Sequence, residues 1–199
     1  MSTQTALAYR VFTGAEIADF VDDLARLRVT VFRDWPYLYD GDEAYERRYL
    51  ANYAKGDSIV VTAQADGRIV GAATGMPLGD HADDFASAFE GSGIDMSDVF
   101  YCAESVLLPA CRGQGAGHVF FDRREAHAAR LGFSRVAFAS VVRPPDHPAR
   151  PADYRPLDTF WRKRGYAPLE GVVAHFAWRD LGAAEDSRKP LQFWIKDLP

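Results

Sequence analysis

A chain of 199 residues is long enough to bury a sizeable core as one domain. Its 48% hydrophobic and 26% charged residues are typical of a globular protein, and a formal net charge of −5 argues against a nucleic-acid or anionic-membrane partner. The first residues show no export signal, no apolar stretch approaches the roughly 20 residues of a membrane span, and Cys102 and Cys111 suit neither a disulfide framework nor a metal site. We therefore expect a cytoplasmic protein without a metal.

The N-terminal third begins with a strand at 8–12, predicted from alternating apolar and polar residues. Thr13 and Glu16 have the spacing of a capping box, which predicts the start of a helix. That helix has one buried face, which consists of Ile17, Phe20, Val21, Leu24 and Leu27. Pro36 interrupts the aromatic segment that follows, and a second helix is predicted over 42–55.

The rest of the chain is expected to alternate strands and helices. β-Branched runs at 58–64 and 68–73 flank Asp66-Gly67, which predicts a hairpin. The polar stretch 77–97 is interpreted as an insertion that is helical around 83–89. Further strands are predicted at 99–108, 135–142, 172–178 and 191–195, and helices at 115–131 and 157–164 that stop at Gly132 and Gly165. A proline-rich loop spans 143–156. We expect one mixed α/β domain over 1–199, with a core of about 8–178 and a C-terminal strand within 190–199.

The segment Arg112-Gly113-Gln114-Gly115-Ala116-Gly117 lies between a predicted strand and a predicted helix. The first turn of a helix has amides without intrahelical partners and carries the positive end of the dipole. Glycines let a phosphate approach those amides, and Arg112 adds a forked cationic donor. The turn therefore predicts an anion site suited to a pyrophosphate.

Two other phosphate motifs do not fit this spacing. A Walker loop needs Gly-Lys-Ser/Thr, and the dinucleotide fingerprint needs its last glycine one position later than Gly117. The order Arg-x-x-Gly-x-Gly, after a strand that ends in Val-Leu-Leu-Pro, resembles the central motif of the GNAT superfamily of N-acetyltransferases. The order of elements over most of 9–178 is similar to that family as well.

The resemblance implies an α+β fold: a mostly antiparallel central sheet with splayed central strands, flanked by helices. It implies acetyl-CoA, or another short acyl-CoA, as co-substrate, and direct attack of an amine on the acyl carbon. The backbone amides of 114–118 would face the pyrophosphate, and the main chain of 106–108 would bind the pantetheine and the thioester carbonyl. The cofactor-binding residues implied in this way are Val106, Leu107, Leu108, Arg112, Gly113, Gln114, Gly115, Ala116, Gly117, His118 and Phe160.

Direct aminolysis needs a group that accepts a proton. Glu104 is the candidate general base, since a carboxylate is unusual within an apolar strand. The alternatives are that Glu104 faces solvent or pairs structurally with an arginine. Many family members use a tyrosine as general acid where this chain has Trp161, so Tyr154, Tyr166 or solvent would have to replace it.

The early loops supply candidates for the acceptor site. Trp35, Tyr37 and Tyr39, together with nearby carboxylates, suit a cationic amine, although such aromatic residues are as often ordinary core. The proline-rich loop could form a lid or a homodimer contact. The leading hypothesis is an N-acetyltransferase that acts on a primary amine, with the acceptor unassigned. The alternatives are a non-catalytic acyl-CoA-binding module and a regulatory protein that binds another anion.

Overall fold

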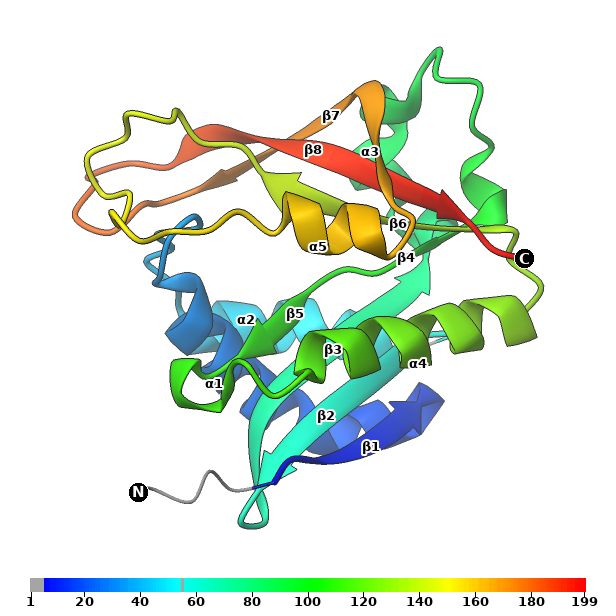
Figure 1. Ribbon diagram of the computed structural model, residues 1–199, viewed down its shortest axis with the longest axis horizontal. Helices are drawn as coiled ribbons and strands as arrows, with labels where there is room; N and C mark the ends of the chain where they lie inside the picture. Colours follow the sequence, from blue (N-terminus) through cyan, green and yellow to red (C-terminus); the bar gives the residue numbers. More distant parts are fainter. Residues whose placement is uncertain (1–5, 55) are drawn as a thin grey trace.

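The computed structural model describes residues 6–54 and 56–199. The expectation about an export signal rests partly on residues outside this range, and so does the predicted end of the second helix at Lys55. The described residues form an eight-stranded sheet in the order β1-β2-β3-β4-β6-β8-β7, with β5 beside β3 (Figure 1). Every pairing is antiparallel except that of β4 with β6. The strands are β1 (Ala8–Thr13), β2 (Ile59–Ala65), β3 (Arg68–Pro77), β4 (Val99–Tyr101), β5 (Ser105–Leu107), β6 (Arg135–Val141), β7 (Ala167–Trp178) and β8 (Ser187–Asp197).

Helices cover both faces of this sheet. In Figure 1, α4 and α5 lie in front of it and α1 and α2 lie behind. The α-helices are α1 (Val21–Phe32), α2 (Glu43–Leu50), α3 (Ala82–Phe89), α4 (Ala116–Arg130) and α5 (Asp158–Lys163). Shorter 3₁₀ turns are Gly14–Phe20, Ala51–Ala54, Leu78–His81, Met96–Asp98 and Pro109–Cys111. Among the described residues, no helix is both long and apolar enough to cross a membrane.

The local signals at the N-terminal end of the chain are confirmed. The Thr13 backbone N–H donates to the Glu16 carboxylate, which completes the capping box. The helix that it opens begins as a 3₁₀ turn and becomes α-helical only at Val21. Asp42 caps α2 by accepting a hydrogen bond from the Tyr45 backbone N–H at 2.7 Å. The Asp66-Gly67 turn joins β2 to β3 with positive φ at both residues, as a two-residue hairpin requires.

The second half of the chain also follows the predicted order. The insertion contains α3, and α4 and α5 are followed by Gly132 and Gly165, whose φ angles are 89° and 90°. The residues between β6 and α5 form no helix or strand. Strands β7 and β8 are longer than expected, because their exposed ends carry polar residues that weaken the apolar signal.

The predicted strand at 99–108 is interrupted, and this interruption opens the sheet. β4 pairs with both β3 and β6, whereas β5 pairs with β3 alone. The last bond to β6 runs from the Cys102 N–H to the Ala137 carbonyl at 2.7 Å. Over 103–108 the main chain pairs with β3, starting with the Ala103 N–H and the Thr74 carbonyl at 3.1 Å, and within the described part of the chain it forms no further hydrogen bond to β6. The central strands therefore diverge after Cys102, which confirms the splayed sheet.

The buried arginine of α4 fixes this break in the strand. Arg124 is 1% exposed and donates to the carbonyl of Thr74 at 3.1 Å and to that of Glu104 at 3.0 Å. Its guanidinium also donates to the Ser105 hydroxyl at 2.9 Å. Because these acceptors belong to β3, to the interruption itself and to the start of β5, Arg124 ties α4 to the point where the sheet opens.

Candidate active site

The glycine turn ahead of α4 has the backbone of an anion site. Gly113 and Gly115 have φ angles of 80° and 81°, which L side chains rarely adopt. A Cβ atom added at either glycine would meet nothing within 4 Å, so their requirement is conformational rather than steric. Among the described residues, none accepts a hydrogen bond from the backbone N–H groups of 113–117. These amides are free to bind a pyrophosphate.

The His118 amide is an exception to the sequence expectation. It donates to the Gly115 carbonyl at 3.0 Å, so it belongs to the first turn of α4 and does not face a phosphate. The His118 imidazole remains beside the turn, where its Nδ1 accepts from Arg164 at 3.2 Å. Phe160 packs on the same turn: a Cβ added to Gly117 would lie 3.3 Å from its ring. Gly117 therefore provides space for Phe160.

Arg112 lies at the entrance of the turn with its side chain exposed. Its Nε donates to the Leu107 carbonyl at 3.3 Å, and its Nη2 lies 3.7 Å from the Asp34 carboxylate. These contacts place the guanidinium between the end of β5 and the glycine turn. An anion that binds the turn would therefore meet Arg112 as a second charged donor.

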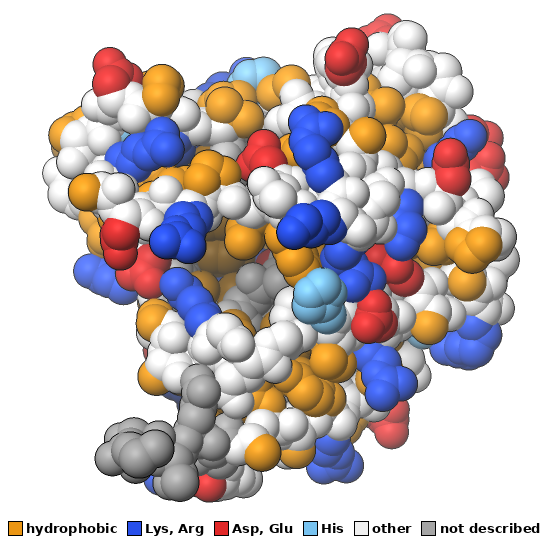
Figure 2. All heavy atoms as spheres, viewed as in Figure 1, with side chains coloured by type: hydrophobic (Ala, Val, Ile, Leu, Met, Phe, Trp, Pro, Cys, Tyr) orange, Lys and Arg blue, Asp and Glu red, His pale blue; other side chains and the backbone are white. Residues whose placement is uncertain are grey.

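The opening between β5 and β6 exposes one edge of β5. The Leu108 N–H donates to the Val70 carbonyl at 2.9 Å, so this amide is used inside the sheet and cannot bind the pantetheine as expected. Successive residues of a strand direct their backbone N–H and C=O groups to opposite sides. Val106 lies two residues before Leu108, so its backbone groups also face β3. Leu107 therefore directs its N–H and C=O away from β3 and into the opening. Figure 2 shows the surface hollowed there, with Lys and Arg side chains gathered around the hollow.

A cavity of about 610 Å³ lies on the other face of the sheet, with Glu104 in its wall. Glu104 is 7% exposed, so the alternative in which its side chain faces solvent is wrong. Arg28 on α1 approaches its Oε2 at 2.8 Å and also forms an ion pair with Glu46 on α2. The predicted alternative of an arginine partner is thus present, but it uses only one carboxylate oxygen. The other, Oε1, is buried and accepts no hydrogen bond from any described residue.

The electrostatics of this cavity keep the Arg28 guanidinium charged and the phenols of Tyr37 and Tyr49 neutral. Burial alone would lower the pKa of Arg28, but the attraction of Glu104 and Glu46 raises that pKa well above its usual value. Burial raises the pKa of Tyr37 and of Tyr49 to about 12. Both phenols therefore stay protonated near neutral pH and can donate hydrogen bonds.

The predicted acceptor and acid residues are only partly brought together. Tyr37 and Tyr39 line the cavity with Glu104, as expected, whereas Trp35 does not. Trp35 packs under the proline-rich loop, with ring centroids 5.1 Å from His147 and 5.9 Å from Tyr154.

Neither tyrosine proposed as a general acid lines the cavity. The Tyr166 hydroxyl donates to Glu125 at 3.0 Å, and burial raises the Tyr166 pKa far above its usual value, which makes it a poor acid. Tyr154 also lies outside the cavity lining, and burial raises its pKa too. Trp161 packs against Phe138 and Trp194.

Several cavity residues were missed by the sequence analysis. Arg28 lies on α1, and Glu46 and Tyr49 lie on α2. The sequence analysis used only the apolar periodicity of these helices, which gives no information about their polar positions. Trp178 lies near the end of β7. A charged residue at a buried helical position was the one available signal, and Glu46, 1% exposed, is the clearest case.

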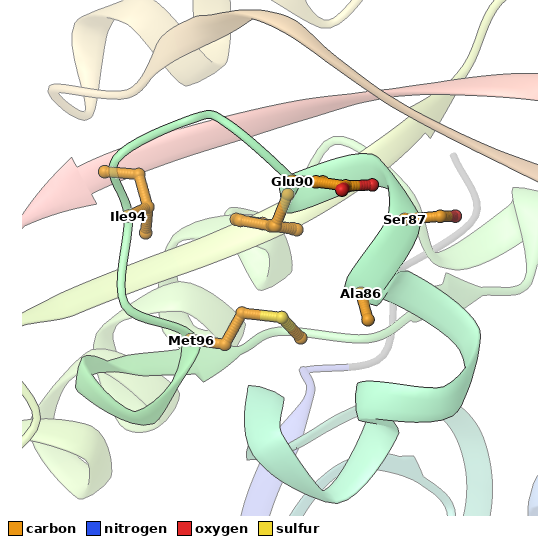
Figure 3. A pocket seen from close by; sticks show the side chains of 6 residues that line it. Ala86, Ser87, Glu90, Ile94 and Met96 are labelled. Carbon is orange, nitrogen blue, oxygen red and sulfur yellow. The ribbon is translucent and has the colours of Figure 1, made fainter.

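A second hollow of about 520 Å³ lies on the outside of the insertion, between α3 and the loop that follows it (Figure 3). Its wall includes the apolar residues Ile94 and Met96, and Glu90 is the one charged group among the described residues that line it. It shares no lining residue with the cavity around Glu104. Without a cation it is unsuited to a phosphate ligand.

Comparison with known proteins agrees with this geometry. Residues 24–152 match the model of the acetyltransferase (GNAT) family. Solved structures with the same fold include a ribosomal-protein-alanine N-acetyltransferase from Brucella melitensis, with 13% identity and a TM-score of 0.61 over 96% of this chain and 99% of the other. A GCN5-related N-acetyltransferase from Kribbella flavida has 17% identity and a TM-score of 0.58 over 97% and 98% of the two chains. The yncA protein from Salmonella typhimurium, solved with its cofactor acetyl-CoA, has 13% identity and a TM-score of 0.57 over 98% and 95%.

The fold is therefore that of an acetyltransferase. The chain belongs to the GNAT acetyltransferase family, and this membership indicates acetyl-CoA-dependent acetyl transfer. No curated protein sequence matches the chain significantly.

Proposed function

We propose that the protein transfers an acetyl group from acetyl-CoA to a primary amine of a small molecule, with Glu104 as the general base. The observation that carries this proposal is the free Oε1 atom of Glu104, buried in the wall of a cavity behind the opening of the sheet. Such an oxygen can accept a hydrogen bond from an amine and then take its proton.

Each group of the chain has a place in this reaction. The amides of 113–117 bind the pyrophosphate, and the N–H of Leu107 points toward the thioester. Acetyl-CoA supplies the activated acyl carbon. Glu104 first takes a proton from the ammonium form of the acceptor, which leaves a neutral amine. The amine nitrogen then bonds to that carbon while the carbon–sulfur bond breaks, and the nitrogen's second proton passes to solvent. The sulfur leaves as thiolate and takes a proton from solvent, since Tyr154 and Tyr166 lie outside the cavity lining.

The missing acid favours one second candidate, a non-catalytic acyl-CoA-binding module. Trp161 stands where many family members have a tyrosine, and its indole cannot act as an acid. The two functions differ in turnover. Purified protein should bind CoA by calorimetry and release free thiol from acetyl-CoA in the presence of a panel of primary amines. CoA binding without thiol release on any amine would favour the module, and absence of CoA binding would contradict both.

The role of Glu104 is tested by Glu104→Gln. This variant should lower kcat/KM for the amine by about 10²- to 10⁴-fold, the usual contribution of a general base. Its Kd for CoA should stay unchanged, because Glu104 lies outside the glycine turn. The matched control is Glu90→Gln, which removes a carboxylate from the separate hollow of the insertion. This change alters neither the glycine turn nor the lining of the cavity around Glu104. Turnover at the wild-type rate in Glu104→Gln would remove Glu104 from the mechanism.

A further inference from the structure

The cavity around Glu104 carries more negative than positive charge. Among the described residues, its lining includes six carboxylates and two guanidinium groups. The carboxylates are Asp40, Asp42, Glu46, Asp84, Glu104 and Asp186, and the guanidinium groups belong to Arg28 and Arg179. A cavity with this imbalance attracts cations, and its walls of aromatic side chains can hold them by cation–π contact.

The negative charge is divided between the interior and the mouth. In the interior, Arg28 lies between Glu46 and Glu104 and compensates one of the two buried carboxylates. One negative charge remains there, next to the unpartnered Oε1 of Glu104. This charge suits a single ammonium group, which is the form in which the reacting amine arrives.

A second anionic position lies at the mouth. Asp40 pairs with Arg179 at 3.1 Å, and Asp84 lies 3.1 Å from His81. Asp42 is used as the cap of α2. Asp186, in the exposed turn between β7 and β8, forms no ion pair with any described residue. It is a free carboxylate on the lining of the same cavity that holds Glu104.

We propose that the acceptor is a small dication, a linear diamine or polyamine. One amine enters to Glu104 and is acetylated, while a second ammonium group stays at the mouth beside Asp186. This inference rests on the proposed function. The volume of about 610 Å³ fits a small molecule, and the aromatic walls, among them Tyr39, Phe176 and Trp178, suit the methylene chain between two amines.

The test compares amines that differ in one charge. Acetylation of 1,4-diaminobutane should exceed that of 1-aminobutane by at least about tenfold in kcat/KM, because the second ammonium group gains both the contact with Asp186 and the attraction of the cavity's excess negative charge. Asp186→Asn should reduce this preference about two- to fivefold, mainly through KM for the diamine, because the contact is exposed. Asp146→Asn, on the proline-rich loop, makes the same change in net charge away from the cavity and should leave the preference intact.

The possible outcomes distinguish failure of the dication acceptor from failure of the proposed acetyl transfer. Equal kcat/KM for the two amines would overturn the dication while acetyl transfer stands. A lysine peptide acetylated faster than either diamine would overturn the small-molecule acceptor. An unchanged preference in Asp186→Asn would overturn the role of Asp186. If CoA binds but no amine is acetylated, the proposed function itself fails.

Discussion

The glycine turn shows how single residues set the geometry of the donor site. Gly113 and Gly115 both adopt positive φ with open space around them, so their value lies in the backbone they permit. An alanine in this region costs about 1–2 kcal/mol, and the chain can relieve that cost by rotating the neighbouring amides away from their shared target.

Gly115→Ala should therefore weaken CoA binding by at least about tenfold, comparable to the loss of one hydrogen bond to a charged group. The control is Gly132→Ala, which has the same positive φ and the same open space but lies beyond the other end of α4. Calorimetry with CoA should separate the two variants, while denaturant unfolding should show a similar loss of stability in both. Equal affinities for CoA in the two variants would contradict a pyrophosphate site at this turn.

At the scale of single residues, the sequence predicted the features that neighbouring residues form. The glycine turn, the Asp66-Gly67 hairpin and the Thr13–Glu16 capping box are each formed by neighbours in the chain. Arg28 and its bond to Glu104 were not predictable, because they join residues far apart in sequence and depend on the angle at which α1 crosses the sheet. The placement of Trp35 was missed for the same reason: its partners, His147 and Tyr154, lie on a distant loop.

Among the elements, the break between β4 and β5 links the two halves of the site. It opens the sheet next to the glycine turn and places Glu104 in the wall of the cavity that we propose for the acceptor. Arg124 joins the interruption and the start of β5 to β3, and its buried guanidinium forms no ion pair with a carboxylate of the described residues. The sequence predicted one continuous strand, because apolar composition alone cannot show where a strand changes its partner.

Arg124→Met should destabilise the protein by at least about 1–3 kcal/mol, since it removes the hydrogen bonds of the buried guanidinium to the Thr74 and Glu104 carbonyls and to the Ser105 hydroxyl. Urea unfolding measures this loss. Arg123→Met, at the exposed neighbouring position on α4, should stay within about 0.5 kcal/mol of wild type. A loss in Arg124→Met no larger than in this control would show that the guanidinium does not hold the break together.

The stability of the whole molecule depends on pH through a second buried group of α4. His127 is 6% exposed; its Nε2 donates to the Asp57 carbonyl at 2.9 Å and its Nδ1 accepts from Arg130 at 2.8 Å. The contact with Arg130 requires the neutral ring, because a protonated Nδ1 cannot accept a hydrogen bond. Burial lowers the pKa of His127 below its usual value, and the nearby charge of Arg130 acts in the same direction.

A lowered pKa means that the unfolded chain binds the proton more readily than the folded one. The free energy of unfolding should therefore fall as the pH falls below about 6.5, the ordinary pKa of histidine. Denaturant unfolding at a series of pH values from neutral to acidic should show a weaker dependence on pH in His127→Gln than in wild type. His175→Gln, at an exposed position of β7, should keep the wild-type dependence. Parallel curves for all three proteins would contradict this assignment.

The splayed sheet separates the parts of the chain that handle the two substrates. The proposed donor turn belongs to one strand-to-helix connection, whereas the walls of the proposed acceptor cavity come mainly from α1, α2, α3, β7 and β8, with Tyr101 of β4 and Glu104 at the break. Acceptor choice can therefore change by substitutions at the cavity mouth, such as Tyr45 or Asp186, without altering any residue that binds CoA. In a redesign, the specificity for the acceptor could therefore be changed while the proposed acetyl-CoA site is left as it is.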